Sequence, residues 1–176
     1  MSHPNASACG CNGAYVAALA HLVAHPGDSA GARAAAETAL SASPEHAEAA
    51  GWLRDSDAGG PDVPYAPSIG WVRIAFTHAF RHLRLRTSFA AALRETLQGG
   101  GDTDTNAAVV CGLLGALHGA RGIEPRLWRP VMGCEAAMDP GPQYRGLRRP
   151  PWLSASRLPS LAAALIDAAP TRLVIE

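Results

Sequence analysis

The sequence predicts an all-α protein, a bundle of helices with no sheet of consequence. Apolar residues recur at helical spacing through most of the 176 residues, and the alternating pattern typical of strands is lacking. Proline and glycine clusters divide these stretches into seven to eight helices. The composition, 48% apolar and 17% charged, is that of a globular protein, and the length favours a single domain over residues 1–176.

The first third of the chain predicts three helices. An alanine-rich stretch, 6–22, is followed by a break at His25-Pro26-Gly27. Asp28 is a suitable N-cap for a second helix that runs to about residue 42. A third helix begins after Ser43, where a capping serine precedes proline and an acidic residue, and it stops near residue 54.

The segment 55–62 alternates aspartates with small residues and has some likeness to a calcium-binding loop. Its twelfth position is Ala66, where an EF-hand needs a bidentate glutamate, so we interpret it as a solvated loop. Three prolines at 61, 64 and 67 keep the chain extended up to Ser68.

A long amphipathic helix is predicted from Ser68 onward, with its apolar stripe centred on Phe76 and Phe80. Its other face carries arginines, which could be a phosphate or nucleic-acid patch. Exposed aromatic residues are not interleaved with them and the protein has no net charge, so a solvated helix face fits better. A further helix, 89–98, follows a capping Thr87 or Ser88.

The most informative stretch is Gly99-Gly100-Gly101-Asp102-Thr103-Asp104-Thr105. The glycines form a turn without side chains, and the oxygens of Asp102, Asp104 and Thr105 suit a hard cation such as Mg²⁺. An apolar helix, expected to start near Asn106, comes next, so the acidic ligands lie where the helix dipole favours negative charge. Its small residues at 108, 112, 115 and 119 predict a groove for another helix backbone.

The last 50 or so residues carry weaker signals. A short helix is expected from Glu124-Pro125, and a final one over about 156–168. Residues 133–153 show no clear period, and we assign them no role.

Charge and cysteine content limit the function classes. Fifteen basic residues balance fifteen acidic ones, which argues against a nucleic-acid scaffold or an anionic membrane surface as partner. The longest apolar run, 107–117, is shorter than the roughly 20 residues of a membrane span. The first residues do not resemble a secretory signal, and the four cysteines form no zinc pattern. We therefore expect a cytoplasmic protein with reduced thiols.

The stretch from Gly101 to Ala108, continuing into Gly115-Ala116-Leu117-His118-Gly119, resembles the C-terminal metal motif of the ADP-ribosylglycohydrolases. The resemblance implies a compact orthogonal helical bundle with two Mg²⁺ ions in a cleft that binds ADP-ribose. It assigns Asp102, Asp104 and Thr105 as metal ligands. The partner it implies is ADP-ribose or an ADP-ribosylated substrate.

The same resemblance suggests substrate contacts. Gly70 and Trp71 match a glycine-aromatic step that brings a ring to the adenine, although Trp71 also suits the core. Gly101 and Thr103 belong to the metal motif itself. The Ser-His-Pro at the start makes His3 a candidate nucleotide contact, with a disordered terminal histidine as the equal alternative.

The resemblance covers nearly all of this chain but only about the C-terminal half of the family fold. The Asp-Asp motif of the family's N-terminal half has no counterpart in the sequence, so the catalytic residues stay unassigned. A Mg²⁺-dependent hydrolase of ADP-ribosyl bonds is expected, incomplete as this chain alone and holding at most part of the metal centre. A second polypeptide could supply the rest. The alternative is an inactive nucleotide-binding or interaction module.

Overall fold

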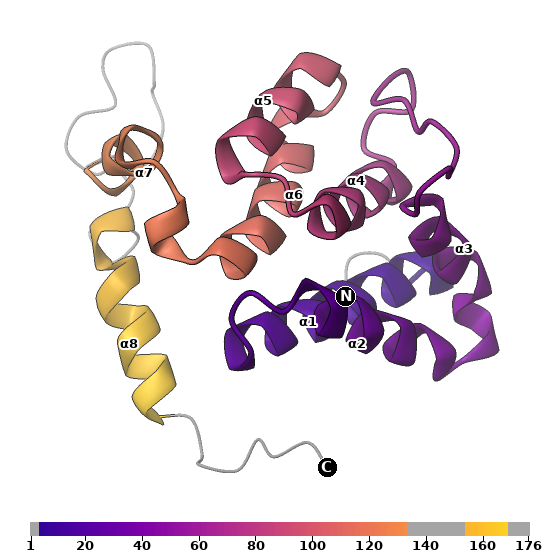
Figure 1. Ribbon diagram of the computed structural model, residues 1–176, viewed down its shortest axis with the longest axis horizontal. Helices are drawn as coiled ribbons and strands as arrows, with labels where there is room; N and C mark the ends of the chain where they lie inside the picture. Colours follow the sequence, from indigo (N-terminus) through magenta and orange to yellow (C-terminus); the bar gives the residue numbers. More distant parts are fainter. Residues whose placement is uncertain (1–3, 134–153, 169–176) are drawn as a thin grey trace. The chain divides into compact units, whose positions relative to one another are not determined.

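A computed structural model describes residues 4–133 and 154–168 of the chain (Figure 1). All the regular structure in these residues is helical, which confirms the all-α prediction. Single 3₁₀ turns lie at Pro44–His46, Ala120–Gly122 and Ala155–Arg157. The α-helices of the described part are α1 (Ala6–Ala24), α2 (Ser29–Ser41), α3 (Ala47–Asp55), α4 (Val72–Leu85), α5 (Phe89–Gly99), α6 (Thr103–His118), α7 (Pro125–Met132) and α8 (Leu158–Ala168).

The chain divides into two compact units, Met1–Ile123 and Glu124–Glu176. The first unit contains α1 to α6, and the second contains α7 and α8. Within the described residues of α7 and α8 no side chain is buried, and Trp128, Val131 and Leu165 are exposed. The expectation of a single domain stays a prediction.

The helix boundaries follow local capping chemistry. The Asn5 side chain accepts hydrogen bonds from two N–H groups at the start of α1, and the side chains of Asp28 and Ser88 each accept one at the start of α2 and α5. Helix α4 begins at Val72 instead of Ser68. The delay arises because Gly70 has a φ of +78°, and Trp71 is extended.

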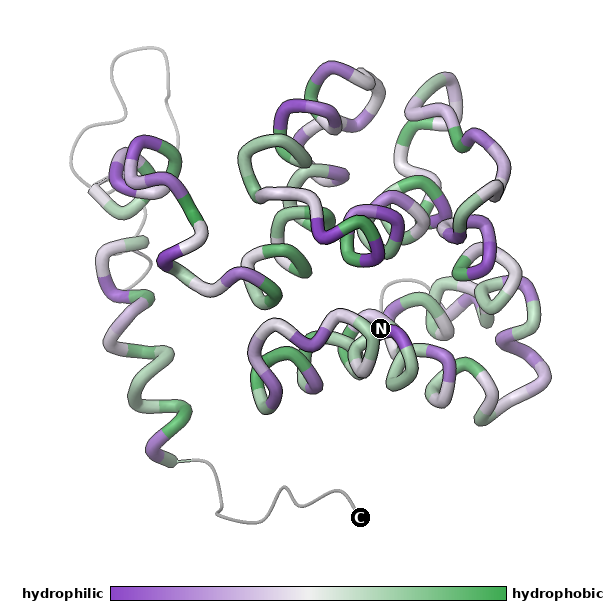
Figure 2. The backbone as a smooth tube through the Cα atoms, in the orientation of Figure 1, coloured by the Kyte–Doolittle hydropathy of each residue, from purple (hydrophilic) through white to green (hydrophobic). Residues whose placement is uncertain are grey.

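The core of the first unit joins small and large residues. Helix α1 packs along α2 through alanines with no exposed surface, among them Ala14 and Ala36. Helix α6 packs against both α4 and α5, and its Leu113 and Leu114 belong to the same cluster as Phe80. Figure 2 colours much of α6 as hydrophobic, in keeping with this central position. The first turn of α6 is therefore held on a helix that cannot move independently of the core.

The expected glycine groove on α6 is only partly present. A side chain at Gly112 would collide with the Tyr15 hydroxyl, which donates a hydrogen bond of 2.7 Å to the Val109 carbonyl. Gly115 has only ordinary contacts around it, and Ala108 is exposed. The predicted groove along α6 is therefore reduced to one close contact, that of the Tyr15 side chain of α1 with Gly112.

Helix α1 is also long and apolar enough, by length and composition alone, to cross a membrane. A core helix passes the same test, and so does a signal sequence near the N-terminus. Ala14, Ala18 and Leu22 of α1 belong to the core of the first unit, which accounts for its apolar character.

Candidate functional site

The acidic residues lie at the beginning of α6. The helix begins at Thr103, earlier than the expected Asn106, because the Asn106 N–H donates to the Asp102 carbonyl at 3.0 Å. Asp102 is therefore the N-cap residue, and Asp104 and Thr105 belong to the first turn. Asp104 and Thr105 are exposed, and Asp102 is half-buried. Their positions leave the acidic side chains accessible to solvent.

The side chains of Asp102 and Asp104 interact with each other. The side chain of Asp102 and the backbone N–H groups of Asp104 and Thr105 hold the pKa of Asp104 below its usual range. Two carboxyl groups this close repel each other when both are ionised. A shared proton or a bound cation relieves that repulsion.

This pair fits one Mg²⁺ ion better than two. Mg²⁺ keeps several of its waters and commonly binds through one or two carboxylates, which Asp102 and Asp104 supply. Thr105 offers a further oxygen from the same turn. Within residues 4–133 and 154–168, no set of three or more His, Cys, Asp or Glu side chains converges as a metal site.

An aromatic residue that the sequence did not single out lies directly against the glycine turn. Tyr65 is 8% exposed. A Cβ atom on Gly99 would lie 2.1 Å from the Tyr65 ring, and one on Gly101 would lie 2.2 Å from the Tyr65 carbonyl oxygen. Tyr65 therefore leaves no room for a side chain at Gly99 or Gly101, two of the three consecutive glycines. The sequence feature that could have indicated a buried Tyr65 is Val63-Pro64-Tyr65, in which apolar residues alternate inside a proline-rich segment.

Trp71, the predicted adenine contact, lies just before α4 and is 42% exposed. Its ring meets Trp52 edge to face, with centroids 5.8 Å apart. The Arg73 guanidinium lies 5.2 Å from the Trp71 ring centroid and also pairs with Asp55 at 2.7 Å. Trp71 is therefore not a core residue, but its ring is already partly covered by Trp52 and Arg73. Its neighbour Gly70 is exposed.

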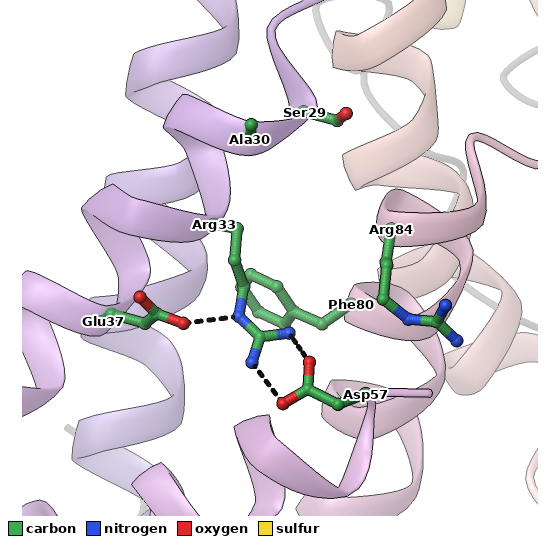
Figure 3. A pocket seen from close by; sticks show the side chains of 7 residues that line it. All are labelled: Ser29, Ala30, Arg33, Glu37, Asp57, Phe80 and Arg84. Carbon is green, nitrogen blue, oxygen red and sulfur yellow. Dashed lines mark hydrogen bonds and ion pairs between the residues drawn. The ribbon is translucent and has the colours of Figure 1, made fainter. Parts of the chain in front are cut away.

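The aspartates of the calcium-like segment are used in ion pairs. In addition to the Asp55–Arg73 pair, Asp57 binds Arg33 at 2.9 Å. Figure 3 shows this second pair beside a hollow of about 300 Å³ that Phe80 also lines. Glu37 binds the same Arg33 guanidinium at 2.9 Å. Because these opposite charges neutralise each other, we assign the hollow a structural role.

The remaining predicted contacts are placed as follows. Thr103 is half-buried at the first position of α6, and Gly101 is exposed with a φ of +68°. His3 lies outside the described residues. Residues 99–105, the acidic turn, are touched by the loop that precedes Trp71, through the contacts of Tyr65 with Gly99 and Gly101.

The fold and the site together define an all-helical protein with a paired-carboxylate turn at the exposed start of a buried helix. The family profile of the ADP-ribosylglycohydrolases matches residues 1–169. The chain belongs to this family, which makes it a glycohydrolase-type protein by descent. No curated protein and no solved structure matches the chain.

Proposed function

We propose that this protein acts in the Mg²⁺-dependent hydrolysis of ADP-ribosyl glycosidic bonds. The observation that carries the proposal is the interacting pair of carboxyl groups, Asp102 and Asp104, at the exposed start of α6. Its family membership supplies the reaction class.

In this proposal the chain binds the metal ion and orients the substrate. Asp102, Asp104 and Thr105 would hold the ion, and the partly exposed ring of Trp71 would be available to a nucleobase. When bound, Mg²⁺ supplies positive charge that stabilises negative charge developing on substrate oxygens. Because α6 is anchored in the core, its first turn presents the oxygens of Asp102, Asp104 and Thr105 in a constant orientation.

A second candidate function has one specific observation in its favour. The described residues contain no third acidic or imidazole ligand near the pair. An inactive module that retains Mg²⁺-assisted nucleotide binding needs no general acid or base, and it would fit this reduced set of ligands. Turnover, or its absence, separates the two functions.

The first test is ligand binding. Mg²⁺ together with ADP-ribose should raise the melting temperature of the purified chain, because a ligand bound only by the folded state stabilises it. Asp104→Asn should abolish that shift, since it removes one of the two charges while keeping the shape of the side chain. Asp62→Asn, at an exposed aspartate outside the turn, is the matched control and should keep the shift. Equal shifts in both variants would refute the metal site.

A further inference from the structure

We infer that Tyr65 is the residue that positions the acidic turn, so that the alignment of Asp102 and Asp104 depends on a side chain from the preceding loop. This inference rests on the proposed function for its consequence in ligand binding. Its structural part rests only on contacts in the first unit.

Tyr65 is itself held on two sides. Its ring stacks on His78 of α4, with centroids 4.0 Å apart and planes at 11°. Its hydroxyl lies 3.5 Å from the hydroxyl of Thr96, a residue of α5 with no exposed surface. With Val63 and Ile74 it forms a small core of its own, separate from the main one.

The loop is tied to α4 at a second point. The Nε2 atom of His78 lies 2.8 Å from the Val63 carbonyl oxygen and donates to it, because a carbonyl can only accept. The backbone next to Tyr65 is thus restrained. A ring held in this way cannot give way easily to a neighbour.

The acidic turn packs directly against Tyr65. Gly99 is the last residue of α5, and Gly101 directly precedes Asp102. Both have their Cα atoms so close to Tyr65 that a methyl group would overlap it. Displacing the ring should therefore release residues 99–105 from their packed position, and with them the two carboxylates.

The test uses a substitution that disturbs Tyr65 without straining the backbone. Gly99 is in α5 and does not have a positive φ, so the backbone there accepts alanine, and any harm from Gly99→Ala comes from the collision with the ring. Gly13→Ala is the matched control, because this α1 glycine has open space around it. Tyr65→Phe keeps the stacked ring, whereas Tyr65→Leu removes it.

Two measurements are made on each purified variant: hydrogen exchange of the backbone N–H groups of residues 99–105, and the Kd for Mg²⁺ by calorimetry. Gly99→Ala and Tyr65→Leu should each speed exchange in the turn about tenfold and weaken Mg²⁺ binding about tenfold. Gly13→Ala and Tyr65→Phe should stay within about twofold of the unmodified protein. A stability loss alone is excluded as the cause by Leu22→Ala, a core variant that should leave Mg²⁺ binding unchanged.

Unchanged exchange at residues 99–105 in both Gly99→Ala and Tyr65→Leu would overturn the inference. If the unmodified protein binds no Mg²⁺, the proposed function loses its metal site, while the exchange data still decide whether Tyr65 holds the turn.

Discussion

At the scale of single residues, Trp71 shows how one side chain is divided between packing and exposure. Its edge contact with Trp52 and its cation–π contact with Arg73 restrain the ring, yet 42% of the residue remains accessible. Trp52, by contrast, is 8% exposed. A restrained and partly exposed aromatic ring loses little conformational freedom when a flat ligand stacks on it.

We therefore predict that Trp71→Ala weakens ADP-ribose binding about tenfold. Stacking of a base on an aromatic side chain contributes roughly 1–3 kcal/mol in single-stranded nucleic-acid complexes, and the lower part of that range corresponds to this loss. Calorimetric titration at constant Mg²⁺ concentration measures it. An unchanged Kd would show that Trp71 serves packing alone.

At the scale of elements, α4 is notable for the polar groups that it buries. His78 and His82 are 3% and 1% exposed, and Thr77 donates to the Trp52 carbonyl at 3.3 Å. Burial lowers the pKa of both histidines because the core solvates an imidazolium poorly. Arg81 lowers the pKa of each further, whereas Glu95 opposes the shift. Asp62 also raises the pKa of His78.

We predict that these two buried histidines make the stability of the protein acid-sensitive. Near pH 6.5, the ordinary pKa of histidine, the unfolded chain binds more protons than the folded one, so stability rises with pH through this window. We expect the melting temperature to fall as the pH is lowered from about 7.5 to below about 6.5. His78→Gln, which keeps a donor for the Val63 carbonyl but does not titrate, should flatten the profile.

Thermal unfolding followed at a series of pH values checks this prediction. Val16→Ala, a change at an exposed side chain that does not titrate, should leave the slope unchanged. A His78→Gln profile as steep as that of the unmodified protein would show that other groups cause the acid sensitivity.

At the scale of the whole molecule, we predict that the number of metal ligands limits activity. In the proposed site the two carboxylates of the acidic turn would retain one hydrated Mg²⁺, and among the described residues no third acidic or histidine side chain groups with them. We also predict that the chain does not supply the general acid or base, a group that typically contributes about 10²–10⁴-fold to a rate. The purified 176-residue chain should therefore be a poor hydrolase or none.

The assay is release of ADP-ribose from modified arginine and serine peptides in the presence of Mg²⁺. We expect little or no turnover by the chain alone, and a gain when a polypeptide carrying the family's Asp-Asp motif is added. Robust turnover by the chain alone, lost in Asp104→Asn, would show that residues other than Asp102, Asp104 and Thr105 complete the site.

The sequence by itself determined the helical class and the place of the acidic turn. Helical periodicity and capping are local properties, set by residues three or four positions apart, so the order of residues alone identifies Asp28 as a cap and limits the cap of α5 to Thr87 or Ser88. The metal motif is equally local, because its glycines and carboxylates lie within a few positions of one another. The family assignment followed from these neighbouring residues, and the family profile confirms it.

Only the tertiary structure decided what surrounds these residues. Tyr65 meets Gly99 and Gly101, which lie in a different segment of the chain, and the pairing of Asp57 with Arg33 spans 24 positions. Neither contact leaves a periodic trace in the sequence, because each depends on how separate helices pack. The half-exposure of Trp71 depends in the same way on Trp52 and on the delayed start of α4. Local chemistry therefore located the acidic turn on the chain, and long-range packing decided which side chains hold that turn in position.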